Sequence, residues 1–222
     1  VKEKDASAYV FGVLPEKKEI PLYGIENVLM VQFIPGSFTW ATGIPADEVP
    51  PEGFKLEDVF PWALSTMEGI NAVDSEQEHS LLLRRFLDQC QAKKTGRRDS
   101  DEKMAASIAG YMMQNRRAVR MKELEDRYGY TARTLQKLVL KNVGITPKQL
   151  SLQICLQSAI RQLSDNKECS LTEMSHQMDL YDQSHLNRIF RKMTGLCPGE
   201  YIKRLEGRAA GEEPKQIKHA LS

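Results

Sequence analysis

The stretch YTARTLQKLVLKNVGITP at residues 130–147 is followed, 51 residues further on, by YDQSHLNRIFRKMTGLCP at residues 181–198. Both stretches begin with Tyr, carry apolar residues three and four positions apart, and continue through a Gly to a Pro. Apolar residues at this spacing form one stripe along a helix, while the Gly ends that helix and the Pro begins another. A short helix-like segment precedes each copy, around Leu124 and around Met174. The repeat therefore predicts two helix-turn-helix units in one chain.

The second helix of each copy has an apolar stripe and an outward face. The stripes are formed by Leu135, Leu138 and Val139 and by Leu186, Ile189 and Phe190. The positions between them are polar or basic, as expected of a face that meets solvent or a polar partner. Thr131 and Asp182 are predicted N-caps, and Gly144 and Gly195 suit the left-handed position after a helix. Residues 146–149 and 170–173 have the pattern of capping boxes, which open the next helix.

The stretch from about Met121 to Arg204 resembles the DNA-binding domain of AraC/XylS-type bacterial transcription regulators. That family has two helix-turn-helix units joined by a long helix, and its second unit ends in Phe-x-x-x-x-Gly-x-x-Pro-x-x-Tyr. Here this ending stands as Phe190, Gly195, Pro198 and Tyr201. The resemblance implies a mainly α fold, sequence-specific binding of double-stranded DNA, control of transcription and a cytoplasmic location.

The chain departs from the family pattern at a few packing and turn positions. Glu125 stands where a small Ala is usual, Val139 where an aromatic is usual, and Cys155 where Arg is usual. Asp179 and Leu180 replace the usual Gly-Phe of the turn. If the Glu125 carboxylate were buried without a partner, we would expect Glu125→Ala to stabilise the domain.

Charge separates the chain into two halves, although its overall net charge is only +1. Residues 1–100 hold 11 Lys and Arg against 16 Asp and Glu, and residues 101–222 hold 20 against 14. The half with the repeat is the basic one, as a phosphate-binding module requires. No run of 18 apolar residues predicts a membrane span, and the charged start is unlike a signal peptide. Four scattered Cys without metal spacing fit free structural thiols in a reducing compartment.

Residues 1–92 are predicted to be a small, partial α+β domain for sensing or assembly. Its expected strands are residues 8–13 and 28–34, and residues 31–60 weakly resemble the end of the amino-terminal domain of some AraC-type regulators. An amphipathic helix is predicted for residues 74–91; packing on the sheet and formation of a homodimer are equally open roles. Residues 93–100 read as a linker, 101–206 as the DNA-binding domain and 207–222 as a flexible tail.

Within residues 101–206, a leading helix is expected at 101–114, a connecting helix at 146–165 and a closing helix at 198–204. The connecting helix is apolar on more than one side, which predicts that it packs against two neighbours. Twenty residues make a rod of about 30 Å, close to one turn of B-DNA at about 34 Å. Such a rod is long enough to place the two outward helices in successive major grooves.

The outward positions of the repeat supply the candidate DNA contacts, and they match the outward positions of the family's recognition helices. Arg, Lys, Gln, Asn and Ser are the side chains that read base edges, whereas further Lys and Arg bind phosphates. The predicted base contacts are Arg133, Gln136, Lys137, Gln183, Ser184, Asn187 and Arg188. The predicted phosphate contacts are Lys141, Arg191 and Lys192. No catalytic residue, metal or cofactor is predicted.

Two other functions compete with DNA-binding regulation. A protein-interaction module with a decayed DNA-binding face would explain Glu125 and Asp179. A DNA-repair methyltransferase would need a reactive Pro-Cys-His-Arg motif or a Cys-rich zinc site, and neither stands in the sequence. RNA polymerase, a small-molecule effector and a second copy of the chain through residues 74–91 are further possible partners.

Overall fold

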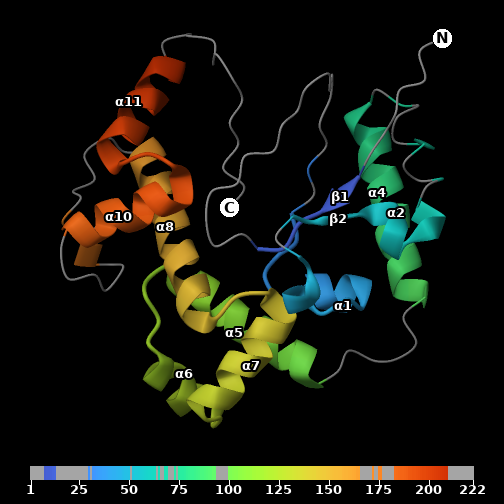
Figure 1. The fold of residues 1–222 in the computed structure, drawn as a ribbon, viewed down its shortest axis with the longest axis horizontal. Coiled ribbons are helices and arrows are strands. Elements are labelled where there is room, and N and C mark those ends of the chain that lie inside the picture. Colours follow the sequence, from blue (N-terminus) through green and yellow to red (C-terminus); the bar gives the residue numbers. More distant parts are fainter. Residues whose placement is uncertain are drawn as a thin grey trace. The chain divides into compact units, whose positions relative to one another are not determined.

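A computed structural model describes residues 8–13, 30, 32–50, 52–63, 65, 68–69, 73, 75–93, 100–165, 172, 175–176 and 183–209 (Figure 1). The described chain is mainly helical and has one small two-stranded sheet, which confirms the predicted fold class. It divides into two compact units. The first unit contains the elements up to Ala106 together with Leu138–Gly144, and the second contains the remaining helical residues from Ser107 onward.

The first unit combines a short strand pair with short helices. Strand β1 (Tyr9–Val10) pairs antiparallel with β2 (Phe54–Lys55), so that Tyr9 lies opposite Lys55. The helical elements of this unit are α1 (Phe38–Thr42), η1 (Ala46–Glu48), α2 (Leu56–Val59), η2 (Pro61–Ala63) and the long α4 (Glu76–Lys93).

Helix α4 is the amphipathic helix predicted for residues 74–91. Its Phe86 and Cys90 are buried with Ala63 in a small core, and the Phe86 ring stacks on Trp62 with 5.3 Å between ring centroids. The apolar stripe of α4 thus packs inside its own unit, against η2. Leu81 lies off this stripe and is 50% exposed.

The prediction of two buried strands was largely wrong. Only Tyr9 and Val10 of residues 8–13 form a strand, and the described residues 30 and 32–34 are in none. Met30 and Ile34 are 55% and 65% exposed. A strand depends on a partner for its backbone hydrogen bonds, and β1 takes its partner from residues 54–55 instead. Residues 28, 29 and 31 lie outside the described part of the chain.

A segment of the first unit holds the end of helix α7 (Ala132–Val143). The buried Thr39 hydroxyl donates to the Asn142 carbonyl oxygen at 3.4 Å and accepts from the Ala46 N–H at 3.1 Å. A Cβ on Gly144 would lie 3.0 Å from the Ala46 carbonyl oxygen, and Gly144 has φ of 90°. A side chain at Gly144 would therefore be strained and tightly packed against Ala46. These contacts of Thr39 and Ala46 with the end of α7 are called the clasp below.

The regular elements described in the second unit are all helices. It contains α6 (Met121–Tyr128), α8 (Pro147–Asp165), α10 (Gln183–Thr194), α11 (Pro198–Ala209), α7 as far as Lys137, and α5 (Ser100–Asn115) from Ser107. Helices α5 and α8 confirm the predicted leading and connecting helices. Helix α11 continues to Ala209, so its last turn occupies the start of the predicted tail. Residues 94–99 of the predicted linker and residues 210–222 lie outside the described residues.

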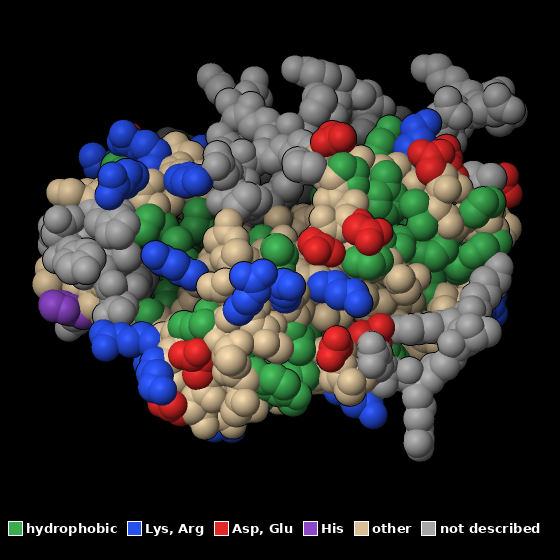
Figure 2. All heavy atoms as spheres, turned by 60° about the horizontal axis from the view of Figure 1, so that its bottom comes forward, with side chains coloured by type: hydrophobic (Ala, Val, Ile, Leu, Met, Phe, Trp, Pro, Cys, Tyr) green, Lys and Arg blue, Asp and Glu red, His purple; other side chains and the backbone are tan. Residues whose placement is uncertain are grey.

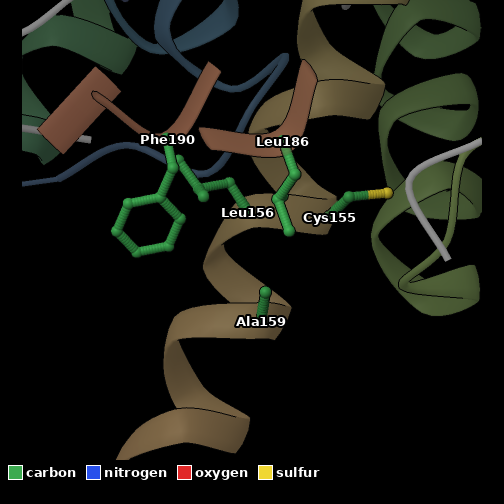
Figure 3. Packing of buried hydrophobic residues seen from close by; sticks show 5 residues of the cluster. All are labelled: Cys155, Leu156, Ala159, Leu186 and Phe190. Carbon is green, nitrogen blue, oxygen red and sulfur yellow. The ribbon is translucent and has the colours of Figure 1, made fainter. Parts of the chain in front are cut away.

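Helix α10 packs on α8 through the apolar stripe that the sequence predicted. Leu186 and Phe190 are fully buried and point toward Cys155, Leu156 and Ala159 of α8 (Figure 3). Tyr201 of α11 meets the Phe190 ring edge-on, with 5.5 Å between centroids. Helix α8 is thus one wall of a core that fixes the position of α10. No described helix is long and apolar enough to cross a membrane.

Candidate nucleic-acid interface

The first helix-turn-helix consists of α6, the turn at residues 129–131 and α7. Gly129 adopts φ of 71°, and its N–H donates to the Glu125 carbonyl oxygen at 2.9 Å, which ends α6. Thr131 accepts from the Thr134 N–H at 3.4 Å, so it occupies the predicted N-cap position. The left-handed Gly permits the tight change of direction that brings α7 across α6.

Glu125 is a cap and not an unpartnered core charge. Its carboxylate accepts from the Ala132 N–H, the first of α7, at 2.7 Å. The side chain is half-buried. A carboxylate at a helix N-terminus satisfies a free N–H and interacts favourably with the helix dipole. The condition for the expected gain on Glu125→Ala, a buried carboxylate without a partner, is therefore not met.

Helix α6 is fixed to α5 by a polar cluster. The Glu123 carboxylate accepts from the Tyr111 hydroxyl of α5 and from both terminal nitrogens of Arg117, at 2.7 and 3.0 Å. The Arg127 guanidinium lies over the Tyr111 ring, 4.1 Å from its centroid. The hydrogen bonds from Arg117 and then from Tyr111 hold the pKa of Glu123 below its ordinary value. Charged Glu123 therefore helps to orient the helix on which the turn is built.

The outward face of α7 carries the predicted first set of contacts. Arg133, Gln136 and Lys137 are exposed, and Lys141 follows them one turn later. These four side chains make no hydrogen bond or ion pair with any described residue. Leu135, Leu138 and Val139, on the opposite side, are 0–9% exposed. The helix therefore presents uncommitted donors and acceptors on one side only.

Helix α10 carries the second set. Ser184, Asn187 and Arg188 are exposed, as are Arg191 and Lys192 in the last turn. Gln183 is the first residue of α10, but its side chain lies outside the described part. Of the helix before it, only residues 172, 175 and 176 are described, and they are helical. Asp182, the predicted N-cap, Asp179 and most of the predicted box at 170–173 also lie outside that part.

Both copies end with the same backbone conformation and the same pattern of hydrogen bonds. The N–H of Gly144 donates to the Leu140 carbonyl oxygen at 2.8 Å, and the N–H of Gly195 donates to that of Arg191 at the same distance. Both glycines have positive φ, as predicted. The Thr146 N–H then donates to the Gln149 side chain at 3.0 Å, and the Cys197 N–H donates to Glu200 at 2.8 Å. The second bond holds the pKa of Glu200 below its ordinary value.

Two exposed apolar side chains flank the α7 face and were not predicted as contacts. Tyr130 is 42% exposed at the turn, and Leu140 is 38% exposed in the last turn of α7. They are the only large hydrophobic residues exposed among the described residues from 100 onward. The repeat already indicates that Leu140 lies on the outward face, because its counterpart 51 residues on is the basic Arg191.

The described surface is mixed in charge. Figure 2 shows Lys and Arg side chains in several groups, with Asp and Glu between them. Among the described His, Cys, Asp and Glu, no group of three is placed to hold a metal ion. Cys90 and Cys155 are buried free thiols, and burial raises the pKa of Cys155 to about 11.

Comparison with known proteins matches part of the chain. Residues 124–204 match a family model described as a helix-turn-helix domain. Among solved structures, the chain is similar to the C-terminal domain of AraT, a response regulator from Geobacillus stearothermophilus. That similarity has a TM-score of 0.41 and 15% identity, and it covers 52% of this chain and 93% of the other. A search of curated proteins finds no match.

The family model begins in α6 and ends in α11, so it spans both copies of the repeat and the connecting helix α8. Residues 124–204 therefore form an AraC-type helix-turn-helix domain, a domain of DNA-binding transcription regulators.

Proposed function

We propose that the chain binds specific DNA sequences with both copies of the repeat and thereby controls transcription. The observation that carries this proposal is a match of exposed side chains between the copies. Gln136 and Asn187 are both amides, and Lys137 and Arg188 are both cations, at corresponding positions of α7 and α10. An amide pairs with adenine N6 and N7, and a cation donates to guanine O6 and N7. A solvated surface has no reason to repeat this order.

The proposed contacts divide into two kinds. Base edges are read by Arg133, Gln136 and Lys137 of α7 and by Gln183, Ser184, Asn187 and Arg188 of α10. Phosphates are bound by Lys141, Arg191 and Lys192, which lie in the last turns of these helices. Phosphate contacts position the protein on the duplex, and base contacts give it sequence preference.

The length of α8 supports binding in two successive major grooves. Its 19 residues span about 28 Å, and one turn of B-DNA is about 34 Å. We therefore expect a site of about 15–20 base pairs with two separated blocks of preferred bases. A homodimer through residues 74–91, an effector and RNA polymerase remain proposed partners. The packing of Phe86 inside its own unit leaves Leu81 as the apolar side chain of α4 that such a dimer would use.

Selection of bound fragments from a random DNA pool by the full-length protein tests this function. We expect enriched sites with two conserved blocks about one helical turn apart. A variant carrying both Gln136→Ala and Asn187→Ala is the matched control, since it changes one amide in each copy. It should lose preference at one position in each block. Enrichment of no sequence, or equal binding of all duplexes, would reject specific DNA binding. It would favour a protein-interaction role.

A further inference from the structure

We propose that Leu140 reads a thymine methyl group, so that the half of the DNA site bound by α7 contains a required thymine. This inference rests on the proposed DNA-binding function and adds a specificity residue to it. The first observation is exposure: Leu140 is 38% exposed, whereas Leu135, Leu138 and Val139 of the same helix are 0–9% exposed.

The position of Leu140 on the helix places it with the base-reading side chains. Arg133 and Leu140 are seven residues apart, which is about 20° short of two full turns. Gln136 and Lys137 lie between them on the same side, and all four are exposed. Seven residues rise about 10 Å, which corresponds to about three base pairs of B-DNA. Leu140 therefore extends the α7 face along the groove.

The clasp leaves this side of the helix open. Residues of the first unit reach α7 through the carbonyl of Asn142 and through Gly144. Gly144 follows Leu140 by four residues, so the clasp reaches the same end of the helix, yet Leu140 is 38% exposed and is not covered by it.

The chemistry of the side chain selects its target. Leu has no hydrogen-bond donor and no charge, so it binds neither a phosphate nor the polar edge of a base. The thymine C5-methyl is the apolar group that a base pair presents in the major groove. In the second copy the corresponding residue is Arg191, an exposed cation suited to a phosphate. The two copies therefore differ in what the last turn of the outward helix contributes.

Deoxyuridine scanning of the selected site tests the inference with the full-length protein. Each thymine of the α7 block is replaced in turn by deoxyuridine, which removes one methyl and keeps Watson–Crick pairing. At one position we expect the substitution to weaken binding by the native chain about fourfold, the effect of uncovering one methyl group. Leu140→Ala should bind thymine and deoxyuridine at that position equally, at the affinity of the native chain for deoxyuridine.

Two further variants separate this contact from other effects. Arg191→Ala should keep the discrimination between thymine and deoxyuridine and flatten the salt dependence. Leu140→Lys should lose the discrimination and steepen the salt dependence, as a phosphate contact does. Thermal denaturation checks that Leu140→Ala remains folded. If sites are selected but no thymine distinguishes the native chain from Leu140→Ala, the inference is wrong while DNA binding stands. If no sequence is selected, both proposals fail.

Discussion

The two helix-turn-helix copies share their turns and helix caps. They differ in the contacts that hold their outward helices and in the side chains that these helices expose. Both end on a left-handed Gly and restart with a side-chain cap on the next helix. Helix α10 is held by a Phe190 that is buried with α8 and Tyr201. Helix α7 has the smaller Val139 at that position and is held at its far end by the clasp. The two copies of the repeat thus keep the same backbone path, although different packing contacts hold it in place.

The difference in support gives the largest expected effect. Phe190→Ala removes a fully buried ring and should lower the free energy of unfolding by about 3–5 kcal/mol. Val139→Ala, the corresponding change in the first copy, should cost about 2 kcal/mol, since it removes only two methyl groups. Urea denaturation of the two variants measures both values. Equal losses would mean that the copies are supported in the same way.

The clasp provides the second test of the comparison. Gly144→Ala should cost about 3 kcal/mol, because it adds a left-handed side chain and a contact with the Ala46 carbonyl oxygen. Gly129→Ala, where nothing lies within 4 Å of an added Cβ, meets only the backbone penalty of about 1–2 kcal/mol. Differential scanning calorimetry of the two variants makes the measurement. A Gly144 variant no less stable than the Gly129 variant would show that the clasp adds nothing.

Base reading is expected to be shared equally between the copies. Arg133→Ala and Arg188→Ala should each weaken binding to the selected site by about 1–3 kcal/mol and relax preference in one block. Lys141→Ala is the control, since loss of a phosphate contact weakens all sequences alike and lowers the salt slope by about 1. Titrations of DNA with each variant at several salt concentrations measure these differences. Unchanged preference in both Arg variants would mean that these helices do not face the bases.

The cap on α7 has the smallest expected effect. Glu125→Ala leaves the Ala132 N–H without its acceptor and should destabilise the chain by about 1 kcal/mol. Glu125→Gln keeps an oxygen acceptor at that position and should cost less. Thermal melts of the two variants compare them. A gain in stability for Glu125→Ala would contradict the cap and restore the interpretation of Glu125 as an unfavourable packing residue.

Much of this fold could be predicted from local sequence patterns. The contacts between residues distant in sequence could not. The roles of Gly144, Gly195 and Gln149 follow from bonds over three or four residues, so the sequence pattern contains them. The Thr39 contact with Asn142 joins residues 103 apart, and no periodicity indicates it. The pairing of residues 9–10 with 54–55 is likewise a long-range choice, and for this reason residues 30 and 32–34 were wrongly predicted to lie in a strand.

At the interface, residue type was a better guide than family expectation. The outward polar residues of α7 and α10 were predicted from the spacing of the apolar stripes, and those whose side chains are described are exposed. Glu125 was misread because the family places a small residue there, whereas its carboxylate reaches a helix N-terminus seven residues later. Leu140 was overlooked because an apolar side chain in a helix is expected to be buried.

The burial of Cys155 on α8 gives the core around this helix a built-in chemical reporter. The residue is 2% exposed and, with a thiol pKa of about 11, almost entirely protonated at neutral pH. Alkylating reagents attack the thiolate, so Cys155 reacts only when the packing around α8 opens. The half-buried Cys197 remains open to reagent without such a movement. The ratio of the two alkylation rates thus measures how often this core opens while the protein as a whole stays folded.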